Sequence, residues 1–404
     1  MTIESLIANI VRNIRSQNGH ELAKQYSLND SHIQDQTLIG FHSEYVKMGS
    51  QFSLWKEMLI AHLKIINYVH DKNFKCAFDY QIQLIQLIFD LFKQIEEDNW
   101  FLPVVYAISV DLRLLAFAVN SKTGSKVKDL SRDSRSSMTV AVDYIRRLFN
   151  ECSFDKNTTF ESSKRLGMMA MCNQLFKIYF AINQFTLCKP LINAIENLGI
   201  AEKFSVSHQV TFNYYVGRKY IFDNNFQKAV EYLTFAFENC HRNSVKNKKS
   251  ILLYLIPVKM LMGILAPESL LMKYNLPEFV GIMKSVRNGN ISFLDSELNK
   301  NKAFFINCGI YLILEKLKYI AYRNLFKNVC KAMENHLIPI SVFCDALKFA
   351  GVPDIDMDET CCILANLIFE NKIKGYLAHQ QQKLVISKTN AFPSLHLTSL
   401  TITR

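Results

Sequence analysis

The stretch that decides the fold is YYVGRKYIFDNNFQKAVEYLTFAFENCHRNSVKNKKSILLYLIPVKMLMG, residues Tyr214–Gly263. Its first half has the pattern of a tetratricopeptide-type helical hairpin, in which Gly217 allows close contact and Tyr220 fills space. Asn225 closes an Asp-Asn-Asn turn and is placed to cap the second helix. One face of that helix carries Ala229, Leu233 and Ala236. A single hairpin cannot bury such a face, so the pattern predicts further helical hairpins packed on both sides.

The composition agrees with a mainly helical, globular chain. Of 404 residues, 49% are hydrophobic, while only 13 are Gly and 8 are Pro. Ten cysteines without a CxxC pair indicate reduced core residues of an intracellular protein. The longest apolar run, residues 251–266, is broken by Pro257 and Lys259 and is too short to span a bilayer, so a soluble protein is expected. The net charge of +11 indicates an anionic partner, either nucleic acid or an acidic peptide.

The chain divides by pattern into five parts. We expect a poorly defined leader over residues 1–50, helical repeats over 51–208 and a tetratricopeptide-like helical part over 209–318. A winged helix is expected over 319–390 and a frayed tail over 391–404. The polar stretch Lys122–Ser137 predicts a surface loop within the repeats.

The winged helix is predicted from three short helices followed by a hairpin. The helices are expected at Tyr322–Glu334, at Val342–Ala350 and after Asp356, which has Glu359 three residues later as in a capping box. Two strands should flank the three glutamines 380–382. The sequence therefore predicts a mainly α fold, an α-solenoid of tetratricopeptide-like hairpins capped by a C-terminal winged helix.

A helical solenoid that runs into a winged helix is the design of the PCI domain, which proteasome-lid, COP-signalosome and initiation-factor subunits share. Strings such as NQLFKIYFAINQFTLCKPLI, ILEKLKYIAYRNLFK and ILANLIFENKIKGYLAHQQQKLVISK resemble the PCI-domain subunit of the TREX-type mRNA export complex. The resemblance runs from about Trp55 to Pro393 and does not extend to the first fifty residues, the last dozen or the loop Lys122–Ser137.

The resemblance implies a non-catalytic scaffold in the nucleus, associated with the nuclear pore, with some cytoplasmic protein. It implies a larger PCI-containing partner of the germinal-centre-associated nuclear protein/Sac type and a small acidic DSS/Sem protein. The winged helices of the two large subunits would form a surface for weak, sequence-independent binding of RNA or DNA. The alternative is an assembly subunit of a proteasome-lid or signalosome-type complex without nucleic-acid binding.

Two sets of basic residues are candidate binding sites. For the acidic peptide the candidates are Arg218, Lys219, Arg242, Lys246, Lys248, Lys249 and Lys259, four of them in the basic hinge HRNSVKNKKS; the alternative is a solvated basic loop. For nucleic acid they are Lys316, Lys318, Arg323, Lys327, Lys331, Lys372, Lys374, Lys383 and Lys388; the alternative is a winged helix used for protein pairing alone.

The third winged-helix helix begins with acidic residues, which repel phosphates. A sequence-specific transcription factor that reads the major groove is therefore disfavoured. For the interface with the large partner, the candidates Phe304, Phe305 and Tyr311 could be either core or contact residues. The chain has no HExxH, nucleophile elbow or GxGxxG string, so the sequence predicts neither an enzyme nor a metal or cofactor site.

Overall fold

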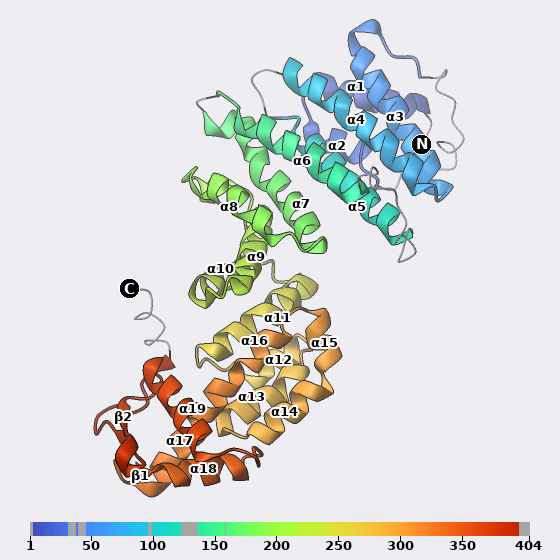
Figure 1. The fold of residues 1–404 in the computed structure, drawn as a ribbon. Coiled ribbons are helices and arrows are strands. Elements are labelled where there is room, and N and C mark those ends of the chain that lie inside the picture. Colours follow the sequence, from blue (N-terminus) through green and yellow to red (C-terminus); the bar gives the residue numbers. More distant parts are fainter. Residues whose placement is uncertain are drawn as a thin grey trace. The chain divides into compact units, whose positions relative to one another are not determined.

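The structure is a computed structural model that describes residues 3–30, 38, 46–95, 99–122, 136–157 and 159–395 (Figure 1). The chain divides into two compact units, Met1–Tyr215 (unit 1) and Val216–Arg404 (unit 2). The division falls inside helix α9, Val206–Phe222, as does the boundary between residues 208 and 209 expected from the sequence. Most of the predicted loop, residues 123–135, lies outside the described residues.

Unit 1 is a stack of helices. From α3 to α8, each helix contacts the next one along the chain. The helices of unit 1 before α9 are α1 Ile3–Arg15, α2 Gly19–Gln25, α3 Ser53–His70, α4 Phe74–Gln94, α5 Leu102–Lys122, α6 Ser137–Ser153, α7 Met168–Ala181 and α8 Cys188–Glu196.

Residues 3–30 differ from the poorly defined leader expected from the sequence. They form α1 and α2, whose side chains Leu6, Ile10 and Leu22 are fully buried, and α2 packs against α5. Helix α2 has only seven residues, and the polar stretches that follow each helix hid this packing from sequence reasoning. Residues 31–37 and 39–45, which belong to the same predicted leader, lie outside the described part of the chain.

Helix α5 is the central helix of unit 1. Among the described residues it is the one helix long and apolar enough to cross a membrane by length and composition. It is packed against α2, α4, α6 and α7, and Ile108, Leu112 and Ala116 are fully buried. Packing in this unit therefore accounts for part of its apolar character, since 44% of the apolar segment is buried.

Asp111 is the ionisable group buried most deeply in α5. Its side chain is 1% exposed, and Oδ2 accepts a hydrogen bond of 2.9 Å from the main-chain N–H of Leu28. Burial raises the pKa of Asp111 to about 7, although the Leu28 hydrogen bond and the charge of Arg113 act in the opposite direction. The segment after α2 is thus fastened to α5 by a carboxyl group that is partly protonated near neutral pH.

We expect this carboxyl group to shape the pH dependence of unit 1. The folded pKa lies above the unfolded value of 3.8, so the contribution of Asp111 to stability is complete below about pH 4 and is lost as the pH rises through about 7. Asp111→Asn should remove this slope, which is at most about 1.4 kcal/mol for each pH unit. Urea unfolding followed by tryptophan fluorescence measures it, because both tryptophans, Trp55 and Trp100, belong to unit 1. An equal slope in the variant between pH 4 and pH 7 would contradict the prediction.

Unit 2 contains the helical part and the winged helix. After α9, its helical part consists of α10 Phe226–Asn239, α11 Val245–Leu261, α12 Glu268–Lys273, α13 Glu278–Asn288, α14 Ile291–Lys300, α15 Lys302–Asn307 and α16 Tyr311–Glu315. The winged helix consists of α17 Leu317–Met333, β1 Leu337–Pro339, α18 Ile340–Phe349, α19 Met357–Phe369, β2 Gly375–Ala378 and β3 Lys383–Ile386.

The hairpin predicted at α9 and α10 is confirmed. A Cβ on Gly217 would lie 2.6 Å from Cγ of Leu233, so a larger residue does not fit without movement of the helices. The rings of Tyr220 and Tyr232 stack at 5.5 Å between centroids. The Asn225 side chain accepts a hydrogen bond of 3.2 Å from the N–H of Lys228, as the predicted cap requires.

The basic hinge expected over residues 241–250 is shorter in the structure. Helix α11 begins at Val245, so Lys246, Lys248 and Lys249 lie in its first turns. Two of these ammonium groups donate to main-chain carbonyl oxygens. Lys248 Nζ donates to the carbonyl oxygen of Phe237 at 2.8 Å, and Lys249 Nζ donates to that of Asn275 at 2.7 Å. Positive side chains in the first turns of a helix interact unfavourably with the helix dipole. These hydrogen bonds to neighbouring segments help to offset that effect at the start of α11.

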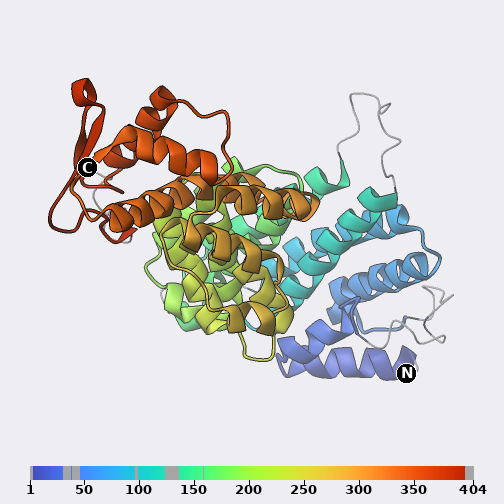
Figure 2. The ribbon, with the colours of Figure 1, turned by 90° about the horizontal axis from the view of Figure 1, so that it is seen from below.

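The winged helix, the orange to red end of the ribbon in Figure 1 and Figure 2, has one strand more than predicted. The strands form an antiparallel sheet in the order β1-β3-β2, with Ile338 of β1 opposite Leu384 of β3. Strand β1 has only three residues and ends in Pro339, so it carries no alternation that a sequence pattern could reveal. The first helix starts at Leu317, five residues earlier than predicted.

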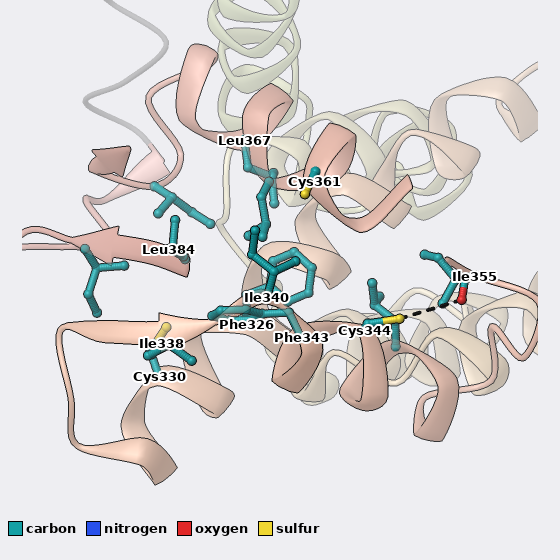
Figure 3. Packing of buried hydrophobic residues seen from close by; sticks show 14 residues of the cluster. Phe326, Cys330, Ile338, Ile340, Phe343, Cys344, Ile355, Cys361, Leu367 and Leu384 are labelled. Carbon is teal, nitrogen blue, oxygen red and sulfur yellow. Dashed lines mark hydrogen bonds between the residues drawn. The ribbon is translucent and has the colours of Figure 1, made fainter. Parts of the chain in front are cut away.

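The core of the winged helix lies between its three helices and the sheet (Figure 3). The rings of Phe326 from α17 and Phe343 from α18 meet edge to face at 5.1 Å. Leu367 of α19 and Leu384 of β3 are fully buried in the same cluster. Asp356 caps α19 as predicted, with Oδ1 accepting a hydrogen bond of 2.7 Å from the N–H of Glu359.

Candidate nucleic-acid interface

A row of cations follows one face of α17. Arg323, Lys327 and Lys331 are spaced four residues apart, which places them on neighbouring turns of one helix face. Lys318 is one turn and a half earlier and is neutralised by Asp295, at 2.7 Å between Nζ and Oδ1. From the sequence, these four residues were predicted together as nucleic-acid-binding residues. The structure distinguishes Lys318, which has a carboxylate partner, from the other three.

The row opens into a cavity of about 550 Å³. We call it the α13–α17 cleft. Its walls come from the end of α11, from α13, from α17 and from the segment after residue 391. The lining residues are Met260, Met262, Gly263, Leu265, Val286, Arg287, Ile320, Arg323, Asn324, Lys327, Asn328, Lys331, Phe392, Pro393, Ser394 and Leu395.

Side-chain amides of α17 hold α13 in place beside the cleft. Asn324 Nδ2 donates to the carbonyl oxygen of Val286 at 2.8 Å, and Asn328 Nδ2 donates to that of Asn288 at 3.3 Å. Both acceptors belong to the last turn of α13, where carbonyl groups lack partners within the helix. Gly289 follows in the left-handed conformation, with φ of 71°, and a Cβ there would lie 2.5 Å from the Leu325 nitrogen. This arrangement brings Arg287 to the same cleft as the α17 cations.

The charge in the cleft is uncompensated. None of its lining residues is acidic. Within the described part of the chain, Arg287, Lys327 and Lys331 form no ion pair. Burial lowers the pKa of Lys327, and the positive charges of Arg323 and Lys331 lower it further. An anion in the cleft would relieve this repulsion between like charges.

Arg323 has a different role from its neighbours, because it is 5% exposed and bound to main-chain groups. Its guanidinium donates to the carbonyl oxygens of Lys372, at 3.1 Å, and of Pro393, at 2.6 Å. It also donates to Oδ1 of Asn324, at 3.1 Å, and lies over the ring of Phe392. Arg323 therefore positions the walls of the cleft, and its charge contributes to the field inside it.

The segment after residue 390 packs where a frayed tail was expected. Pro393 and Leu395 are buried, and the N–H of Lys374 donates to the carbonyl oxygen of Ala391 at 2.8 Å. Leu395 lies against Gly263, where a Cβ would come within 2.8 Å of its Cδ1. Residues 396–404 of the predicted tail lie outside the described part of the chain.

The other predicted nucleic-acid residues lie outside the cleft. Lys316 Nζ binds Oδ1 of Asn224 at 2.6 Å, and Lys372 Nζ pairs with Glu370 at 2.5 Å. The wing carries Lys374 and Lys388, both exposed, and the half-buried Lys383. Arg287 was missed, because nothing in the sequence indicates that the end of α13 meets α17.

The residues predicted for an acidic peptide do not form one free surface. Lys219 is 8% exposed and pairs with Asp223, and Arg218 lies 4.4 Å above the ring of Tyr254. Lys248 and Lys249 bind carbonyl oxygens, as described above, and Lys259 is half-buried. Arg242 and Lys246 are the exposed members of the predicted set.

The residues predicted for the large partner are divided between core and surface. Phe305 is fully buried and packs 5.7 Å from Phe279 between ring centroids, so it belongs to the core and is not accessible to a partner. Phe304 and Tyr311 are half-buried. The exposed apolar side chains of these helices are instead Ile306 and Leu312, at 52% and 72%. Helices of five and six residues are too short for a sequence pattern to show which face is buried.

The described residues provide no candidate metal-binding site. They contain no group of three or more His, Cys, Asp or Glu side chains placed to hold a metal ion.

The role assigned to Arg323 predicts a stability effect. Arg323→Met leaves the carbonyl oxygens of Lys372 and Pro393 without their donor, so unit 2 should lose about 2–4 kcal/mol. Amide hydrogen exchange should also become faster over residues 391–395. Lys331→Met, on the exposed part of the same helix face, should change stability by less than about 0.5 kcal/mol. Equal effects of the two substitutions in urea unfolding and hydrogen-exchange mass spectrometry would contradict the assignment.

Comparison with known proteins supplies the family. The PCI domain model matches residues 298–388, from α14 to just beyond β3. The chain is 43% identical over 395 residues to PCI domain-containing protein 2 of Xenopus laevis, covering 98% of both chains. It is 38% identical over 400 residues to the Drosophila melanogaster homologue, covering 98% of this chain and 99% of that one. A Neurospora crassa protein named CSN12 homolog is 26% identical over 453 residues, covering 97% of this chain and 99% of its own length.

The relatives span almost the whole chain, both units included, and the PCI match coincides with the end of the helical part and the winged helix. The protein therefore belongs to the PCI domain-containing protein 2 family.

Proposed function

We propose that this protein is a non-catalytic scaffold subunit of a TREX-type nuclear mRNA export complex. It pairs with a larger PCI-domain subunit of the germinal-centre-associated nuclear protein/Sac type and with a small acidic DSS/Sem-type protein. It also contributes a surface for RNA or DNA backbones, and it acts in the nucleus at the pore, with some protein in the cytoplasm. Family membership and the strings described above support the scaffold role.

The observation that carries the nucleic-acid part is the uncompensated charge of the α13–α17 cleft. Arg287, Lys327 and Lys331 have no ion-pair partner among the described residues, whereas Lys318 and Lys372 each have a carboxylate neighbour. Unpaired cations at a concave surface attract phosphates without reading bases. The start of α19 exposes Asp358 and Glu359, which opposes major-groove reading by that helix.

A second candidate is an assembly subunit of a signalosome-type complex that binds no nucleic acid. The name CSN12 homolog, carried by the Neurospora crassa relative, favours it. So do the exposed aromatic side chains of the winged helix, Phe349 at 96% and Phe369 at 86%, which suit a protein contact.

A salt titration of the full chain separates the two candidates. We expect filter binding to RNA with a Kd of roughly 10⁻⁶ to 10⁻⁴ M near physiological salt, with less than about a threefold difference between unrelated sequences. The logarithm of the binding constant should fall linearly with the logarithm of salt concentration, with a slope of about −0.7 for each phosphate of a single strand that is contacted. Absence of any binding at 50 mM salt would remove the nucleic-acid part and leave the assembly role.

Co-purification from nuclear extract tests the acidic partner. Arg242→Glu with Lys246→Glu reverses the two exposed charges near the start of α11, so recovery of a small acidic subunit should fall by roughly fivefold to tenfold at low salt. The matched control is Lys189→Glu with Lys348→Glu, two exposed residues on α8 and α18 that change the net charge equally. Equal recovery with both variants would show that this surface does not attract the subunit.

A further inference from the structure

We propose that the α13–α17 cleft is a binding site for single-stranded nucleic acid, and that a duplex cannot enter it. This inference rests on the nucleic-acid part of the proposed function and specifies its ligand.

The first argument is the arrangement of charge. Arg287 from α13 and Lys327 and Lys331 from α17 line one cavity. The amide hydrogen bonds of Asn324 and Asn328 to the last turn of α13 fix the distance between the two helices. The site is therefore built by packing, and its cations do not depend on a mobile loop. Phosphate oxygens are the anionic groups that arginine and lysine bind in nucleic-acid complexes.

The second argument is shape. A cavity of about 550 Å³ has the size of a pocket for one small ligand, here one or two nucleotides. A duplex is a stiff rod that carries its phosphates on the outside and is bound across broad groove faces. A single strand can bend its backbone into a cleft and turn its bases outward. The cavity thus favours the flexible form of the ligand.

The third argument is the apolar part of the lining. Met262, Leu265 and Phe392 line the same cavity as the cations, and the ring of the half-buried Phe392 lies under the guanidinium of Arg323. Apolar and aromatic side chains are the surfaces on which bases of a single strand lie. One N–H of each of the Asn324 and Asn328 side-chain amides is engaged with α13, and neither phosphate contacts nor stacking distinguishes the four bases. Binding should therefore depend little on sequence.

Fluorescence anisotropy on the full chain tests the inference with a labelled 12-nucleotide RNA and the duplex of the same sequence. Lys327→Gln with Lys331→Gln should weaken single-strand binding at least roughly tenfold and reduce its salt slope by about 1.4, while duplex binding changes less than about threefold. The control, Lys189→Gln with Lys348→Gln, removes the same charge elsewhere and should change single-strand binding less than about twofold. Thermal unfolding of each variant verifies that it is folded.

Photocrosslinking locates the strand directly in the unaltered protein. RNA that contains 4-thiouridine should crosslink to peptides covering 260–265, 286–288, 324–331 or 392–395. Crosslinks confined to the wing, residues 372–388, would overturn the inference, and so would equal losses with both pairs of substitutions. Free uridine triphosphate that binds as tightly as the 12-nucleotide RNA would overturn it in favour of a nucleotide pocket. If neither single strand nor duplex binds at 50 mM salt, the nucleic-acid part of the proposed function fails as well.

Discussion

The contact between the end of α13 and α17 is the constraint on which the rest of unit 2 depends. Gly289 brings the main chain so close to Leu325 that a side chain at this position would collide with the helix. The amides of Asn324 and Asn328 then take the carbonyl groups that α13 leaves open at its end. Because α17 is also the first helix of the winged helix, this contact helps to fix the winged helix to the helical part of the unit, together with the packing of α11, α14 and α16 against α17.

The ability of the protein to attract anions depends more on which basic side chains lack an ion-pair partner than on the total number of basic side chains. The net charge of +11 is spread over many lysines, and several of them are occupied. Lys219 and Lys318 pair with carboxylates, and Lys248 binds a carbonyl oxygen. Exposed or half-buried cations without such partners, as in the α13–α17 cleft, contribute most to attraction of an anionic macromolecule.

Much of the fold could be predicted from the sequence, because its local signals agree with the global packing. Gly217 with Leu233 identified the hairpin, and Asp356 identified the start of the third winged-helix helix. Strand β1 could not be predicted, because its three residues gain their structure from pairing with β3. The packing of residues 3–30 was missed because it depends on contacts that the local pattern does not show, of α1 with α2 and of α2 with α5.

The candidate site was predicted only in part. Lys327 and Lys331 were among the residues predicted from the basic charge of the first winged-helix helix, whereas Arg287 requires knowledge of how two helices cross. Arg323 was grouped with the binding residues because sequence cannot distinguish a guanidinium that binds a ligand from one that holds the main chain.

The wall formed by residues 391–395 has a consequence for the chain end. Arg323 couples this wall to α17 through the carbonyl oxygen of Pro393, and Leu395 closes against Gly263 at the end of α11. A ligand that contacts this wall binds the docked form of residues 391–395 more tightly, so binding of the ligand and docking of this segment then stabilise each other by an equal free energy. A fusion tag or a protease that displaces residues 391–395 would therefore weaken binding of such a ligand, even without contacting any of the basic residues.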